Sequence, residues 1–188
     1  MAESPERKFY LRHFKAIAHA LVTYEDLNLL MNHIVEGTCR RFKAKGCSIM
    51  LMDEREHQLI HVRSYGISDE FLQKGPVVVD DKHSALHTEE PVYIEDLSKS
   101  PYAQYPDAVS KEGIVSMLSI PIKSRQATIG VLRIYHGEHY KFHEEDIETL
   151  CIMSAVLGMV IENNGFKNFL DTIKTALANL PLRLLEGM

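Results

Sequence analysis

Two pairs of short apolar runs, separated by a long turn-rich stretch, constrain the fold of this chain more than any other feature. In the first pair, residues 47–53 are too few for a typical helix, and residues 57–65 alternate between two faces before Gly66 ends the pattern. The second pair, residues 114–122 and 128–135, is rich in β-forming residues and is divided only by a short polar segment. Because both connections are short, each pair is predicted to form an antiparallel hairpin.

The stretch between the hairpins, residues 67–113, contains only short elements. We expect a helical turn near 69–74, an apolar trio at 77–79, a helix near 83–88 and a strand at 92–94. Four prolines interrupt the stretch: Pro76, Pro91, Pro101 and Pro106. A connection this long inside a compact domain is usually functional, often a lid or a binding loop, so we expect a ligand to bind here.

Helical patterns flank the β-rich part of the chain. Apolar residues recur at steps of three and four in residues 9–22, in residues 26–42 and from residue 144 onward. The last pattern meets no proline before Pro181, which allows a helical region of roughly 50 Å at 1.5 Å per residue, with Gly158 and Gly165 as the expected bends. The predicted fold class is therefore α/β (α+β), with a mostly antiparallel sheet of five or six strands and helices at both ends.

Composition excludes several classes of function. The 188 residues suit one domain, and 45% apolar and 25% charged residues are typical of a globular chain. The net charge of −5 comes with no Lys/Arg-rich run, so we expect no nucleic-acid partner. A polar N-terminus and the lack of a continuous apolar run of about 20 residues predict a cytoplasmic protein without a membrane partner. The three cysteines are far apart in the sequence, which favours buried thiols: Cys39, Cys47 and Cys151.

Several segments, in their order and spacing, resemble the GAF family. They are residues 47–51 (CSIML), 90–97 (EPVYIEDL), 119–122 (SIPI), 129–135 (IGVLRIY) and 142–147 (FHEEDI). The resemblance covers residues 26–164. It divides the chain into an N-terminal helix (1–25), a GAF domain (26–164) and a C-terminal helical extension (165–188).

The resemblance implies a PAS-like fold in which helices cover one face of the sheet and a pocket lies on the other. Domains of this family bind cyclic nucleotides, tetrapyrroles, haem, 2-oxo acids or no known ligand, and fold alone does not choose among them. We therefore predict a non-catalytic domain that senses a small molecule and relays binding through its terminal helices in signal transduction. The cofactor is left unknown. The alternatives are a ligand-free dimeric interaction scaffold, or a redox or haem-binding GAF enzyme or sensor.

Candidate ligand-binding residues come from the irregular stretch and from strand positions that face it. They are His83, Ser84, His87, Tyr93, Asp96, Tyr102, Tyr105, Ser116, Leu118 and Arg133. Such a mixture suits a cavity with apolar walls and a few orienting polar groups. The alternative is a set of loop side chains that satisfy local backbone, with Asp96 capping a turn.

Three of these candidates carry specific alternatives. His83 and His87 stand four residues apart, as two ligands on one helix face would, but no further metal-ligand motif accompanies them and we predict no metal site. Arg133 lies in an apolar strand, on the same face as Val131 and Tyr135. Its guanidinium either faces the cavity, where it would pair with a carboxylate or phosphate, or points outward into solvent.

Departures from known GAF subclasses narrow the predicted function. The expected pocket loop has no cysteine, which argues against covalent tetrapyrrole attachment and against the chemistry of free methionine sulfoxide reductase. The Asn-Lys-x-Asp-Glu signature of phosphodiesterase GAF domains is also missing, as are Gly-x-Ser-x-Gly, Walker and His-Glu-x-x-His motifs. We therefore expect no enzymatic activity.

The terminal helices predict a homodimer. The first and last helical patterns carry more apolar surface than one small sheet face can cover, and four such helices from two chains can form a bundle. The alternative is that the segment after Gly165 folds back onto its own domain. The chain shows no output domain, so we expect the signal to pass to a separate protein.

Overall fold

The computed structural model of the protein describes residues 5–8, 19, 26–79, 82–101, 103–125 and 127–178, with side chains to residue 175. Almost all of the helix expected within residues 1–25 lies outside these ranges. The elements, in chain order, are α2 (Leu27–Phe42), β1 (Gly46–Asp53), β2 (Gln58–Tyr65), α3 (Asp69–Leu72), β3 (Val77–Val78), α4 (Ala85–Thr88), β4 (Val92–Ile94), α5 (Pro106–Glu112), β5 (Ser116–Ser124), β6 (Ala127–His136) and α6 (Glu144–Ala178).

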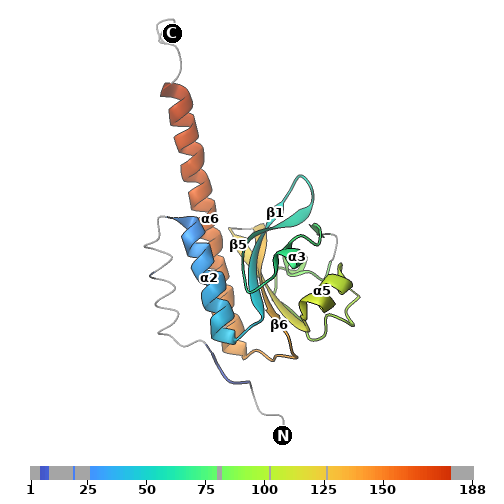
Figure 1. The fold of residues 1–188 in the computed structure, drawn as a ribbon. Coiled ribbons are helices and arrows are strands. Elements are labelled where there is room, and N and C mark those ends of the chain that lie inside the picture. Colours follow the sequence, from blue (N-terminus) through green and yellow to red (C-terminus); the bar gives the residue numbers. More distant parts are fainter. Residues whose placement is uncertain are drawn as a thin grey trace, which may run out of the picture.

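The strands form one six-stranded antiparallel sheet in the order β3-β2-β1-β6-β5-β4. Both predicted hairpins are present, as β1–β2 and β5–β6, and β1 pairs with β6 to join them. Helices α2 and α6 lie side by side on one face of the sheet, while α3 and α5 lie on the other (Figure 1). The predicted fold class is confirmed.

Strand alternation separates the two faces. The alternate residues Leu118, Ile120 and Ile122 of β5 are fully buried against the helices, together with Leu132 and Ile134 of β6. Their partners in this core come from α2 and α6: Leu30, Met31, Ile34, Val35, Leu150, Met153 and Leu157. We call this side of the sheet the helix face, and the side that carries α3, α4 and α5 the cavity face.

Local signals set the ends of α2. The Asp26 carboxylate accepts hydrogen bonds from the backbone N–H groups of Asn28 and Leu29, at 2.8 and 3.3 Å. Such an N-cap satisfies donors that have no partner inside the helix. At the other end, Lys43 adopts a left-handed conformation, and Arg40 and Arg41 complement the negative end of the helix dipole.

Helix α5 was missed by the sequence patterns. It begins with Pro106 at its first turn and ends at Gly113, which has a φ of 70°. Proline at the start of a helix and a left-handed glycine after its end form the usual asymmetric pair of boundary signals. The segment is too short to display a helical apolar stripe, so periodicity gave no sign of it.

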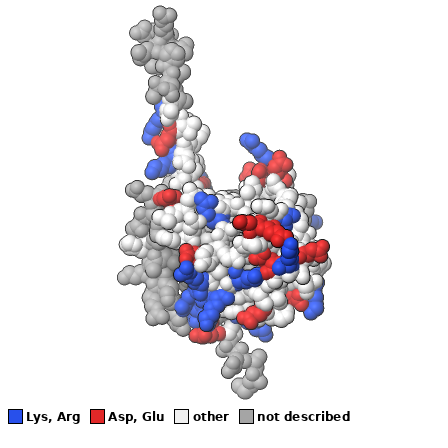
Figure 2. All heavy atoms as spheres, in the orientation of Figure 1, with Lys and Arg blue, Asp and Glu red and all other residues white. Residues whose placement is uncertain are grey.

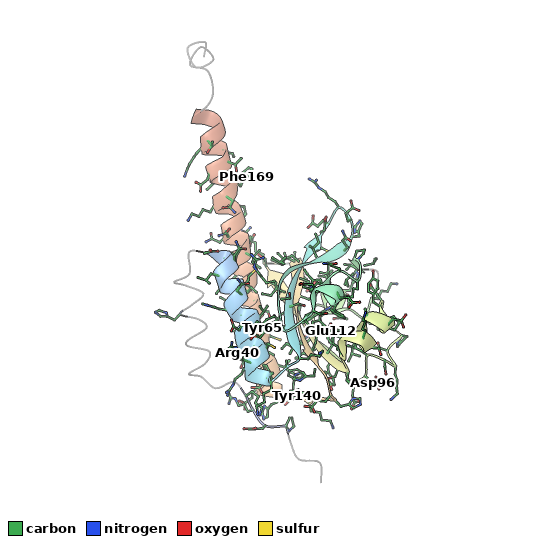
Figure 3. All side chains as sticks on the ribbon, in the orientation of Figure 1. Arg40, Tyr65, Asp96, Glu112, Tyr140 and Phe169 are labelled. Carbon is green, nitrogen blue, oxygen red and sulfur yellow. The ribbon has the colours of Figure 1, made fainter. Side chains whose placement is uncertain are left out.

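Helix α6 spans 35 residues and continues as one helix through Gly158 and Gly165. A Cβ at Gly158 would clash with the carbonyl oxygen of Lys123, so glycine lets the helix approach β5 closely. Beyond the sheet the helix projects from the domain, and Phe166 and Phe169 are 51% and 61% exposed (Figures 1 and 3).

By length and composition alone, α6 is also apolar enough to cross a membrane, over Glu144–Thr175. The sequence expectation had placed no such segment in the chain. The evidence for a span is weak, because the first half of α6 packs against β5 as a core helix does.

Candidate functional site

A cavity of about 420 Å³ lies on the cavity face of the sheet. Its floor is formed by β5 and β6, through Met117, Ser119, Arg133 and Tyr135. Its walls and roof come from the chain between β2 and β5, which is the turn-rich stretch predicted to bind a ligand. The volume falls within the range of about 300–1,000 Å³ that small-molecule sites occupy.

Six of the ten predicted site residues line this cavity. They are His83, Ser84, Tyr93, Asp96, Tyr105 and Arg133. A seventh, Tyr102, lies outside the described residues. The structure therefore brings most of the predicted set together, whereas their role in binding remains a prediction.

Three predicted site residues do not reach the cavity. Leu118 is fully buried in the core on the helix face, and Ser116 Oγ donates to the backbone oxygen of Glu138 at 2.7 Å. His87 Nε2 lies 2.7 Å from the backbone oxygen of Val79, so its ring is held by local backbone. The two strand residues were assigned to the wrong face, because alternation along β5 does not reveal which half of its residues faces the cavity.

Arg133 occupies the floor of the cavity, which settles the question that alternation left open. It sits opposite Ser48 of β1 and Ser119 of β5, and residues opposite each other on neighbouring strands share a face. Its Nε atom is buried and has no hydrogen-bond partner in the part of the chain that the structure describes. A guanidinium remains protonated in proteins, so the floor carries a permanent positive charge.

Lys74 brings a second positive charge to the same cavity. Its Nζ lies 3.4 Å from His61 Nε2, 3.2 Å from the backbone oxygen of Phe71 and 4.0 Å from the centre of the Phe71 ring. Burial lowers the pKa of Lys74 to about 8, with a further contribution from Arg133. Burial likewise lowers the pKa of His61 to about 4, assisted by Lys74 and Arg133, so that this imidazole is neutral near pH 7.

Neutral donors accompany these cations. Ser119 is 3% exposed and lines the floor, and its Oγ has no hydrogen-bond partner among the described residues. The Oγ atom of Ser84, on the wall, is likewise buried and unpartnered within the described ranges. Most buried polar groups in proteins are satisfied, so unpaired hydroxyls facing one cavity indicate a missing partner.

The roof is held by side chains that bond to the edge strand β3. The Gln104 amide accepts from Val78 N at 2.9 Å and donates to Val78 O at 2.6 Å, which is the pairing a further strand would provide. Tyr105 donates to the backbone oxygen of Pro76 at 2.7 Å. Gly75, with a φ of 125°, leaves room for this ring, because a Cβ there would lie 2.7 Å from the Tyr105 hydroxyl. Gln104 was not predicted, since a lone glutamine in a loop carries no sequence signal.

The rim of the cavity contains the acidic residues of the site. Asp96 accepts from the Ser98 backbone N–H at 3.0 Å and pairs with Lys99 at 2.8 Å, and these bonds lower the pKa of its carboxyl. Asp96 thus caps a turn while also lining the cavity. Tyr93 lies opposite Leu118, and its side chain therefore faces the helix face, where its ring contacts Phe142 and its hydroxyl donates to the backbone oxygen of Tyr140 at 2.6 Å.

Thiols and metal ligands are not gathered at the cavity. Cys39 and Cys47 are buried in the helix-face core and Cys151 packs beside it, and burial raises the pKa of all three thiols. Among the residues described, no group of three His, Cys, Asp or Glu side chains is placed to hold a metal ion. On the face of the molecule in Figure 2, basic and acidic side chains are intermingled.

A sheet with helices on one face and a ligand-sized cavity on the other defines a class of small α+β domains that are commonly sensory. The chain belongs to the GAF domain family, whose sequence pattern matches residues 26–161. No curated protein sequence matches the chain.

Several solved structures share the fold. The GAF domain of a phosphoenolpyruvate-protein phosphotransferase from Coxiella burnetii superposes with a TM-score of 0.74 at 19% identity, covering 84% of this chain and 95% of that one. The corresponding Acinetobacter domain gives 0.69 at 24% identity, covering 81% and 92%. Free methionine-R-sulfoxide reductase from Neisseria meningitidis gives 0.65 at 15% identity, covering 85% and 95%. At these identities the likeness concerns the fold alone.

Proposed function

We propose that this GAF domain is a non-catalytic sensor that binds a small molecule in its cavity and relays binding through α2 and α6. One observation carries the proposal: the cavity and the helices lie on opposite faces of the same strands, β5 and β6. Unpaired buried polar atoms at the cavity floor support a binding role, because such groups are costly unless a ligand satisfies them.

Adjacent residues of β5 supply the proposed route for the signal. Ser119 lines the cavity, while Leu118 and Ile120 on either side of it pack in the core that contains Met153 and Leu157 of α6. A closely packed core transmits small strand displacements instead of absorbing them. A ligand that moves the floor would therefore also shift α6.

We also propose that the domain has no enzymatic activity. Methionine-R-sulfoxide reductase shares this fold, so the fold alone does not exclude an enzyme. The cavity lining contains no cysteine within the described ranges, and the buried thiols have raised pKa values that disfavour the reactive thiolate. We propose a cytoplasmic location, with the signal passing to a separate output protein.

A thermal-shift screen tests the binding proposal. Nucleotides, amino acids, oxo acids and haem are added one class at a time to the full chain, because a ligand that prefers the folded state raises its apparent stability. We expect at least one class to raise the melting temperature. A screen in which no class raises it would contradict a sensor role and favour the interaction scaffold.

We further propose that the terminal helices form a homodimer interface. Phe166, Phe169 and Leu170 are more than half exposed on the projecting part of α6, and exposed apolar surface of this kind marks interaction sites. The same surface favours the second candidate function, a dimeric scaffold that needs no ligand. A second chain would cover these side chains on the exposed part of α6.

Light scattering decides the question of assembly. The full chain is expected to be a dimer at tens of micromolar, and a chain ending at Asn164 is expected to dissociate. A matched pair of variants localises the interface: Phe169→Glu should weaken the dimer, whereas Glu54→Gln, in the β1–β2 turn, should not. A monomeric full-length protein would contradict the proposed homodimer.

A further inference from the structure

We infer that the cavity binds an organic anion, whose carboxylate or phosphate group lies against Arg133, Lys74 and Ser119. The inference rests on the proposed function, because it names the class of ligand for the same cavity. Four observations carry it: two cations without a bonded carboxylate, neutral donors without acceptors, acidic residues kept at the rim, and apolar walls above a polar floor.

Arg133 is the centre of the site. Among the described residues no ion pair joins its guanidinium to a carboxylate, and its Nε is buried without an acceptor. A guanidinium does not lose its proton to escape this situation, so an anion that enters the cavity would supply the acceptor that Nε lacks. Its planar donor fork matches carboxylate and phosphate oxygens.

Lys74 strengthens the positive field instead of neutralising it. Its ammonium interacts electrostatically with Arg133, and both line the cavity. Glu112 also acts on Lys74, but among the described residues no ion pair joins the two, and the Glu112 carboxylate accepts from the Ser68 backbone N–H and hydroxyl. Two cations that share one cavity repel each other, and an anion between them would relieve that repulsion.

The neutral groups beside the cations are also suited to an anion. Ser119 pairs with Arg133 across the β5–β6 hairpin, and its unpartnered hydroxyl points into the same floor. The Ser84 hydroxyl is unpartnered on the wall, so it can donate as well. Hydroxyls can donate or accept, but next to two cations the donor role is the favourable one.

The acidic residues of the lining do not compete for this position. Asp96 is neutralised by Lys99 and capped by Ser98, and Glu95 is exposed at the opening. The walls are apolar, through residues Leu59, Val77, Val79 and Val92. A positively charged floor under apolar walls fits a ligand with an anionic head group and an apolar body. The cavity volume of about 420 Å³ is sufficient for a small metabolite.

Matched pairs of compounds test the inference by calorimetry. Two pairs replace a carboxylate by a neutral amide of the same shape, benzoate and benzamide, and hexanoate and hexanamide. A third pair, phenyl phosphate and phenol, removes the phosphate group, and inorganic phosphate serves as a head group alone. We expect at least one anionic member to bind and its neutral partner to bind at least about tenfold more weakly, the equivalent of one charged hydrogen bond. The carboxylate and phosphate pairs distinguish the two head groups.

Variants locate the binding. Arg133→Gln should weaken the anionic member by at least about tenfold, and Ser119→Ala by a smaller factor. Arg55→Gln, in the exposed β1–β2 turn, is the matched control and should leave the affinity unchanged. Melting temperatures of all variants show that each is folded.

The outcomes separate this inference from the proposed function. Neutral members that bind as tightly as anionic ones would overturn the anionic ligand and leave a binding cavity in place. Anionic binding that survives Arg133→Gln would also overturn the assignment. No binding by any compound in the panel would count against the anion, and a negative result in the wider screen as well would count against the sensor itself.

Discussion

On the helix face, β5 presents Leu118 and Ile120 to a core that is closed by α2 and α6. On the cavity face the same strand presents Met117 and Ser119, and the neighbouring strand adds a cation, Arg133. The helix face therefore buries the larger apolar core, while the cavity face buries two smaller apolar clusters around a cavity whose floor carries polar atoms without a partner among the described residues. The difference teaches that alternate residues of one strand can face different environments, a closed core on one side and a cavity, for which we propose a binding role, on the other.

The largest expected effect comes from truncating adjacent residues on the two faces. Leu118→Ala should lower the free energy of unfolding by about 2–5 kcal/mol, because Leu118 is fully buried in a closed core. Met117→Ala should cost less, near the lower end of the same range at about 2 kcal/mol, because this buried side chain also borders an existing cavity. Urea titrations of both variants measure the difference. Equal losses of unfolding free energy in the two variants would contradict the difference between the two faces.

Acidification should destabilise the protein through a histidine on the helix face. Burial lowers the pKa of His136 to about 4, whereas the unfolded value is near 6.5. Because the folded pKa is the lower one, the stability is present above pH 6.5 and is lost as the pH falls toward 4, by up to about 3 kcal/mol.

The control for this pH dependence is His136→Phe, which keeps an aromatic ring against Tyr140 but does not titrate. Unfolding titrations at pH 7, 5.5 and 4.5 should show a shallower pH dependence in the variant. An identical dependence in both proteins would mean that His136 is protonated as easily in the fold as outside it.

Two glycines of α6 test how tightly the helix is held to the sheet. Gly158→Ala should cost about 1–3 kcal/mol, because its Cβ would clash with the Lys123 carbonyl oxygen. Gly165→Ala should instead stabilise by about 0.5–1 kcal/mol through helix propensity, since no other atom lies within 4 Å of the position of its Cβ. Thermal unfolding of the pair measures the opposite signs. Equal and favourable effects would show that α6 does not approach β5 this closely.

Much of the fold could be predicted from the sequence, because hairpins and long helices leave periodic patterns. Both hairpins, α2 and α6 were expected within a few residues of their observed ends. Helix α5 was missed because a helix of seven residues is defined by its boundary residues and not by a stripe.

The cavity was only partly predictable, for a reason that concerns strand pairing. Alternation grouped Arg133 with Tyr135 correctly, but it could not show that Ser119, and not Leu118, shares their face. Which alternate residues of β5 share a face with Arg133 depends on the register between β5 and β6. The sequence of one strand alone does not determine that register. Lys74 was missed because a lysine after a short helix is normally expected to be exposed to solvent. Only the folded structure shows that it is partly buried beside the cavity.

Arg133→Met gives the most direct test of the division between the two faces, because it needs no ligand. The substitution replaces a half-buried cation, whose Nε has no hydrogen-bond partner among the described residues, with an apolar side chain of similar length, so the free energy of unfolding of the ligand-free protein should stay unchanged or rise by about 1 kcal/mol. Urea unfolding of the wild type and the variant at pH 7 measures this. A loss as large as that of Leu118→Ala would contradict the account, because it would show that Arg133 holds the fold together and is not kept for binding.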